Sequence, residues 1–166
     1  MPFQNARRRA YQVDLTYEGT PAQVFPLLCP VREYDWIDGW TCEMVYSDTG
    51  VAEAGCIFRT GFPDLGDEIW TISRYEPDRA IEFVRIAWNV AVVKLDIALE
   101  PEGSERTRAR MTHTYTALSQ AGELLIEALT PQAHEQQMRA GEQMLNHYLQ
   151  TGRKLPRPDV ARALKR

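Results

Sequence analysis

The chain lacks any apolar run long enough to cross a membrane as a helix. Such a helix needs about 20 mostly apolar residues, and the densest apolar stretch, residues 83–93, is interrupted by Arg85 and Asn89. No apolar segment follows the three arginines at positions 7–9, as one would in a signal peptide. The sequence therefore predicts a protein without a transmembrane segment.

Cysteine is scarce, with Cys29, Cys42 and Cys56 the only three in 166 residues. So small and odd a number excludes a disulfide-stapled scaffold of the kind common in small secreted domains. A reducing compartment suits such a chain. We therefore expect free thiols and a cytoplasmic location.

Familiar catalytic and cofactor motifs are also missing. There is no Gly-x-Ser-x-Gly, no Gly-x-Gly-x-x-Gly and no phosphate-binding glycine loop, which argues against a hydrolase elbow and against nucleotide cofactors. His134 and His147 would point about 140° apart around a helix that turns about 100° per residue, so they cannot ligate one metal ion. Since His113 alone provides no ligand set, we expect no metal and no cofactor.

Positive charge is scarce in the body of the chain. The net charge is −4, with 19 basic and 23 acidic residues. The basic groups collect at the ends: three arginines at positions 7–9, and six basic residues against one acid in residues 151–166. A nucleic-acid-binding domain carries its basic patch on the folded surface. We therefore expect no nucleic-acid partner and interpret residues 153–166 as a basic, flexible tail.

What the chain does have is enough apolar material for one core. Hydrophobic residues make up 44% of it and charged residues 25%, as in an ordinary soluble domain. Its length suits one domain, which we place at residues 1–152. The alternation of apolar and polar residues, which is typical of half-buried strands, predicts seven strands, over 11–17, 40–46, 52–58, 68–75, 80–88, 91–100 and 105–118.

Helices are predicted at two places in the chain. Thr20-Pro21 is a start signal, and the helix after it ends at Pro30; a second short helix covers residues 31–37. Ser119 begins a third helix, whose apolar positions are Leu124, Leu125, Ala128 and Leu129. Thr130-Pro131 begins a long final helix that ends at Gly152.

This order of elements, with VFPLLCPVREYDWIDGWTCEMVYSDTGVAEAGCIFRT at 24–60 and LNHYLQTG at 145–152, resembles the START-like (SRPBCC) superfamily. That superfamily includes polyketide cyclase/dehydrase-like, lipid-transfer and pollen-allergen-like proteins, and the chain resembles most the bacterial members without an assigned activity. The resemblance implies an α+β helix-grip fold, in which a curved seven-stranded antiparallel sheet wraps around the long C-terminal helix. Two short helices lie between strands 1 and 2. The resemblance also implies a hydrophobic cavity, but the superfamily has no shared catalytic motif.

The hairpin connections predict which side chains face that cavity. A five-residue loop at 47–51 would place Cys42 opposite Cys56, both as buried thiols. A three-residue turn at 77–79 and a two-residue turn at 89–90 would put the apolar residues of the later strands on one side. The predicted ligand-binding residues are Phe58, Trp70, Ile86, Trp88, Leu95, Met111, His113 and Tyr115 from the sheet and His134 and Met138 from the final helix. We expect Trp36 and Trp40 at the cavity mouth.

Three functions remain open at this stage. The first is binding of a small hydrophobic ligand, such as a lipid, an isoprenoid or an aromatic polyketide, in the internal cavity. The second is a cyclase or dehydratase in which His113, assisted by Tyr115, serves as acid or base. The third is a protein-interaction module, in which a row of arginines at positions 106, 108 and 110 binds a partner and the cavity is incidental. The sequence also leaves open a homodimer, and a filled core in which His113 and Tyr115 only satisfy each other.

Overall fold

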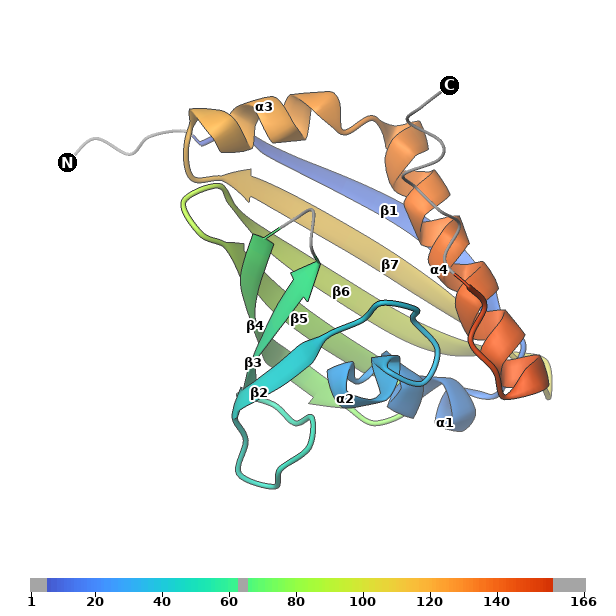
Figure 1. The fold of residues 1–166 in the computed structure, drawn as a ribbon. Coiled ribbons are helices and arrows are strands. Elements are labelled where there is room, and N and C mark those ends of the chain that lie inside the picture. The colour runs from blue at the N-terminus through green and yellow to red at the C-terminus, as the bar shows by residue number, and fades with distance from the viewer. Residues whose placement is uncertain (1–5, 63–65, 157–166) are drawn as a thin grey trace.

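A computed structural model of the chain describes residues 6–62 and 66–156. The chain forms seven strands and four α-helices in the order that the sequence predicts (Figure 1). The strands are β1 (Arg8–Tyr17), β2 (Cys42–Tyr46), β3 (Ile57–Phe62), β4 (Gly66–Glu76), β5 (Ala80–Ala87), β6 (Ala91–Glu102) and β7 (Arg106–Ala117). The helical segments are α1 (Pro21–Val24), the 3₁₀ turn η1 (Phe25–Leu28), α2 (Pro30–Glu33), α3 (Gln120–Ala128) and α4 (Pro131–Thr151).

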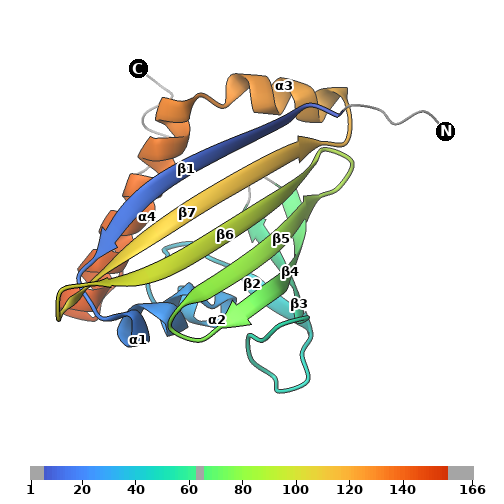
Figure 2. The ribbon, with the colours of Figure 1, turned by 180° about the vertical axis from the view of Figure 1, so that it is seen from behind.

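All seven strands form one antiparallel sheet in the order β1-β7-β6-β5-β4-β3-β2. The sheet is strongly curved, and α1, α2 and α4 lie toward its concave side (Figure 1), whereas its convex side is seen bare from behind (Figure 2). The predicted helix-grip architecture is therefore confirmed. Among the described residues no helix is both long and apolar enough to span a bilayer.

The segment between β1 and β2 is anchored by its two tryptophans. The indole N–H of Trp36 donates to the Leu27 carbonyl at 2.7 Å, and that of Trp40 donates to the Pro30 carbonyl at 2.9 Å. Both rings are buried. Because both indoles are fixed inside the packing, they anchor the short helices and do not form the cavity mouth that the sequence suggested.

The final helices begin and end where the sequence indicates. The Ser119 and Thr130 side chains accept from backbone N–H groups in the first turns of α3 and α4, and Gly152 ends α4 in the left-handed conformation at φ 67°. Two of the apolar positions of α3 do not face the core. Leu124 and Leu125 are exposed, whereas Ile126 is fully buried.

The reason lies in how closely α3 approaches the loop between β5 and β6. A Cβ atom added at Gly122 would lie 1.9 Å from the Val90 carbonyl oxygen, so only glycine fits there. This contact fixes which side of α3 faces the sheet. It leaves Gly122 and Ile126 inside and turns Leu124 and Leu125 outward.

The register of β5 also differs from the prediction. The three-residue turn before it is as expected, with Glu76 opposite Ala80, but a bulge at Ser73 shifts the pairing by one, so that Trp70 faces Arg85 instead of Ile86. The next connection has three residues, with Ala87 opposite Ala91. A shift of one residue inverts every side chain of a strand.

Of the predicted strands, only β5 turns the opposite side chains inward. The bulge at Ser73 and the extra residue in the connection between β5 and β6 each shift the register by one residue, so the two shifts cancel from β6 onward. Ile86 lies on the convex face and is 37% exposed, and Trp88 lies in the connection at 82% exposure. Both were predicted wrongly to line the cavity. The residues of β5 that face inward are Ile81, Phe83 and Arg85.

The hairpin of β2 and β3 is longer than predicted. Cys42 pairs with Thr60 rather than with Cys56, and residues 47–56 form the connection. The Glu53 carboxylate organises this loop by accepting from the Ser47 hydroxyl at 2.9 Å and the Thr49 N–H at 3.1 Å. All three cysteines are free.

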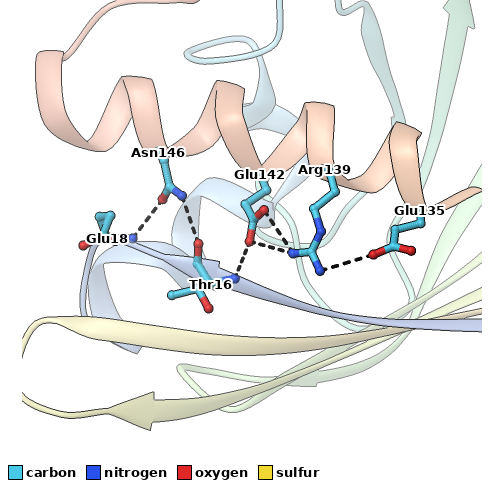
Figure 3. A network of polar contacts seen from close by, with 6 residues as sticks. All are labelled: Thr16, Glu18, Glu135, Arg139, Glu142 and Asn146. Carbon is cyan, nitrogen blue, oxygen red and sulfur yellow. Dashed lines mark hydrogen bonds and ion pairs between the residues drawn. The ribbon is translucent and has the colours of Figure 1, made fainter.

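The long helix α4 is fastened to the free edge of β1. Asn146 donates to the Thr16 carbonyl at 2.9 Å and accepts from the Glu18 N–H at 2.8 Å. The Glu142 carboxylate accepts from the Thr16 N–H and is itself held by Arg139 at 3.1 Å (Figure 3). Side chains of α4 thus satisfy edge groups that would otherwise be open to a further strand.

Replacing the amide that makes two of these bonds should loosen α4. We expect Asn146→Ala to lower the free energy of unfolding by about 1–2 kcal/mol, because two backbone groups of β1 lose their partner. Gln143→Ala, on an exposed position of the same helix, is the matched control and should change it by less than about 0.5 kcal/mol. Urea unfolding measures both; equal effects would contradict the role of Asn146.

Candidate functional site

The concave face of the sheet carries an aligned row of large side chains. Successive pairings join Phe58, Trp70, Arg85, Val93 and Tyr115 across five neighbouring strands. The rings of Phe58 and Trp70 stack at 5.7 Å between centroids. The row is aromatic at both ends and has one charged residue in the middle.

A second row runs beside the first, toward α1 and α2. It joins Ile72, Phe83, Leu95, His113 and Tyr11. Phe83 and His113 are 4% and 7% exposed, yet Leu95 between them is only partly buried. Because Leu95 lies on an inner strand with its side chain on the concave face, its accessible surface shows that no other side chain fully covers this point.

Leu95 and two further half-buried apolar side chains mark the part of the concave side that we call the hollow. Trp70 on β4 and Met138 on α4 also pack against the core without being fully covered. Trp70 comes from β4 and Met138 from α4, which packs against β1, and Leu95 lies on β6 between β4 and β1. The helix therefore does not completely fill the concave face here.

Arg85 and Glu68 place an ion pair on this concave face. Arg85 Nη1 lies 3.3 Å from Glu68 Oε2, and the two side chains are 25% and 12% exposed. The Arg85 guanidinium also lies over the Trp70 ring, 5.2 Å from its centroid, which is within cation–π range. The predicted register would have turned Arg85 to the convex face. The bulge at Ser73, which no residue pattern announces, is the reason for the error with Arg85.

His113 is paired with His134 of α4. Nδ1 of His113 and Nε2 of His134 are 3.0 Å apart, and the Tyr11 ring stacks on His134 at 5.0 Å between centroids. The Tyr11 hydroxyl donates to the Leu129 carbonyl and accepts from Arg9 at 3.2 Å. The two histidines thus join the sheet to the start of α4.

Burial lowers the pKa of His113 to about 3, with a further contribution from the neighbouring His134 and the Arg85 charge. Burial also lowers the pKa of His134. At neutral pH both rings are uncharged. One nitrogen of His113 is occupied, and so low a pKa makes it a weak base near neutrality.

Most of the predicted cavity residues do lie together. The structure brings the following side chains to the concave side or to the helix that faces it: Phe58, Trp70, Leu95, Met111, His113, Tyr115, His134 and Met138. Phe58 and Met111 are buried in the core. Ile86 and Trp88 do not belong to this group.

Sequence reasoning also missed Glu33 of α2. It lies on the same side of its turn as Pro30 and Trp36, which are buried, while its neighbours Arg32 and Tyr34 are exposed. The helical spacing of three could have shown this. No other described residue donates a hydrogen bond to its carboxyl group, and burial raises its pKa to about 8.

No protein-family model and no curated protein matches this sequence, but solved structures resemble its fold. DynU16, from the dynemicin biosynthetic locus, has 15% identity and a TM-score of 0.58 over 87% of this chain and 48% of its own. This chain thus spans about half the length of DynU16. Norcoclaurine synthase from Thalictrum flavum, in complex with dopamine and hydroxybenzaldehyde, has 11% identity and a TM-score of 0.63 over 86% of this chain and 89% of its own.

A bacterial protein belongs to the same set. Mll3558 from Rhizobium loti has 14% identity and a TM-score of 0.58 over 87% of this chain and 99% of its own. These neighbours confirm the helix-grip fold that the sequence resemblance implied. At such identities the likeness concerns the fold, and the site has to be argued from this chain's own residues.

The shifted pKa values of His113 and Glu33 should make stability depend on pH in opposite senses. His113 binds its proton more weakly folded than unfolded, so its contribution is present above about pH 6.5 and is lost as the pH falls. Glu33 binds its proton more tightly folded, so stability falls as the pH rises from about 4.5 to about 8. Thermal unfolding of His113→Asn and Glu33→Gln across pH 4–9 tests both signs.

Relative to the unaltered protein, His113→Asn should lose less stability between pH 7 and pH 4. Glu33→Gln should lose less between pH 5 and pH 9. If stability depends on pH in the same way in the unaltered protein and in Glu33→Gln, the pKa of this carboxyl group is not raised by folding. The same result for His113→Asn would show that folding does not lower the pKa of the imidazole.

Proposed function

We propose that this protein binds a small, largely apolar molecule in the hollow of its concave face. The observation that carries this proposal is Leu95, an apolar side chain on an inner strand that keeps accessible surface while its row neighbours Phe83 and His113 are covered. Trp70 and Met138 flank it. A concave, mostly apolar surface with a few polar groups is the usual form of a small-molecule site.

The fold neighbours lend support from outside the chain. Norcoclaurine synthase holds two small aromatic molecules, dopamine and hydroxybenzaldehyde, in a protein of the same fold. Aromatic side chains such as Trp70 offer large contact area with few torsions to freeze. A ligand with a flat apolar body fits the chemistry of this face.

The two alternatives have less support. Proton transfer by His113 would use a group whose pKa is lowered to about 3 and whose Nδ1 faces His134 at 3.0 Å. The arginine row on the convex face is paired, since Arg110 lies 3.1 Å from Asp14 and the other two lie near Glu102. These observations favour neither His113 as a catalytic base nor the three arginines as a free protein-binding surface, so ligand binding remains the proposal.

A larger side chain at position 95 should weaken the binding of an apolar ligand. N-phenyl-1-naphthylamine, a neutral fluorescent probe, should bind the protein, and Leu95→Trp should weaken its affinity at least tenfold, because the new indole occupies the space. Lys94→Trp adds the same ring one residue away on the opposite face and serves as the matched control. Probe fluorescence titrations measure both, with circular dichroism to confirm folding.

The comparison between Leu95→Trp and Lys94→Trp shows whether the probe binds over Leu95. Unchanged affinity in Leu95→Trp, or equal losses in both, would place the probe elsewhere on the protein. A protein that binds neither this probe nor any copurified apolar molecule in native mass spectrometry would contradict the proposed function itself.

A further inference from the structure

Arg85 has hydrogen-bonding capacity that the described residues do not use. A guanidinium offers five N–H donors, and the side chain makes a single described bond, to Glu68 at 3.3 Å. Among the described residues, the only buried nitrogen without a partner belongs to Arg74, on the other face. No other described residue accepts a hydrogen bond from the remaining donors of Arg85, and the side chain is 25% exposed.

The Trp70 ring connects the guanidinium to the hollow. It sits beneath the guanidinium at 5.2 Å and is itself one wall of the hollow. Arg85 and Leu95 lie on paired strands, one row apart on the same face, and neighbouring rows on a face are about 7 Å apart along the strand. A small molecule that covers Leu95 therefore reaches the guanidinium.

A second polar group faces the same region. The Tyr115 side chain is 6% exposed, and no described residue accepts or donates a hydrogen bond at its hydroxyl group. Tyr115 is separated from Arg85 in the row only by Val93. Burial raises the pKa of this hydroxyl, and the charges of Arg85 and Glu68 also act on it, in opposite directions.

We propose that the ligand of the hollow is a small apolar acid, whose anionic group is bound by Arg85 and Tyr115 while its apolar body lies over Leu95. This inference rests on the proposed function and adds the class of ligand. A guanidinium and a hydroxyl both donate to carboxylate-type oxygens. Of the two members of the ion pair, Arg85 is the more accessible, at 25% against 12%, so an anion rather than a cation meets the open side.

Two probes that differ by one anionic group test this assignment. 1-Anilinonaphthalene-8-sulfonate has the ring system of N-phenyl-1-naphthylamine with an added sulfonate. Arg85→Gln should weaken the binding of the sulfonate at least tenfold and leave that of the neutral probe within about twofold, because only the sulfonate loses charge-assisted hydrogen bonds. The matched control is Arg74→Gln, which removes an arginine paired with Asp96 on the convex face and should change neither affinity.

A second variant tests the assignment from the other side of the ion pair. Glu68→Gln removes the carboxylate that competes for Arg85 and should raise the affinity for the sulfonate several-fold without affecting the neutral probe. This outcome can be read even if Arg85→Gln does not fold.

The outcomes separate this inference from the proposal on which it rests. Failure of the unaltered protein to bind either probe counts against the hollow as a binding site. Binding of both probes with no selective change in Arg85→Gln or in Glu68→Gln leaves the hollow intact and overturns the anion site. A selective loss in Arg85→Gln together with a gain in Glu68→Gln supports the assignment.

Discussion

The hydrogen bonds between α4 and the free edge of β1 determine how much of the concave face the helix covers. Asn146 and Glu142 satisfy the edge groups of Thr16 and Glu18, so the helix lies along one margin of the curved sheet (Figure 1). From there its inward side chains reach the core, and the histidine pair joins its first turn to β7. A single helix at one margin leaves Leu95 accessible in the middle of the sheet.

That geometry gives the concave face two kinds of surface. Near α1 and α2 it is filled, with Leu15, Tyr17 and Leu145 almost completely buried. Toward the loop between β5 and β6 it holds polar groups beside aromatic ones, including the pair Arg85–Glu68. A charged pair is costly to bury unless other groups also bond to it. An anionic ligand would complete the bonding of Arg85, which links the electrostatics of the hollow to the ligand class that we propose.

The sequence alone predicted the fold well and the site only in part. The seven strands, both short helices and the starts of α3 and α4 at Ser119 and Thr130 follow from local periodicity and start signals, which act over a few residues. The face of β5 did not follow, because it depends on a bulge at Ser73 and on one extra loop residue. Those two features hid Arg85 and made Ile86 look like a cavity residue. Glu33 could have been found from its spacing of three with Pro30 and Trp36, which are both buried.

Methyl NMR of methionine-labelled protein tests the central claim, that the space between α4 and Leu95 receives the ligand, most directly. Met138 projects from α4 against the core and remains partly accessible, and Met138→Leu would assign its resonance. The account predicts that N-phenyl-1-naphthylamine shifts the Met138 methyl signal and gives intermolecular nuclear Overhauser effects to it. Saturating probe that binds yet leaves the Met138 methyl group unperturbed would contradict the account.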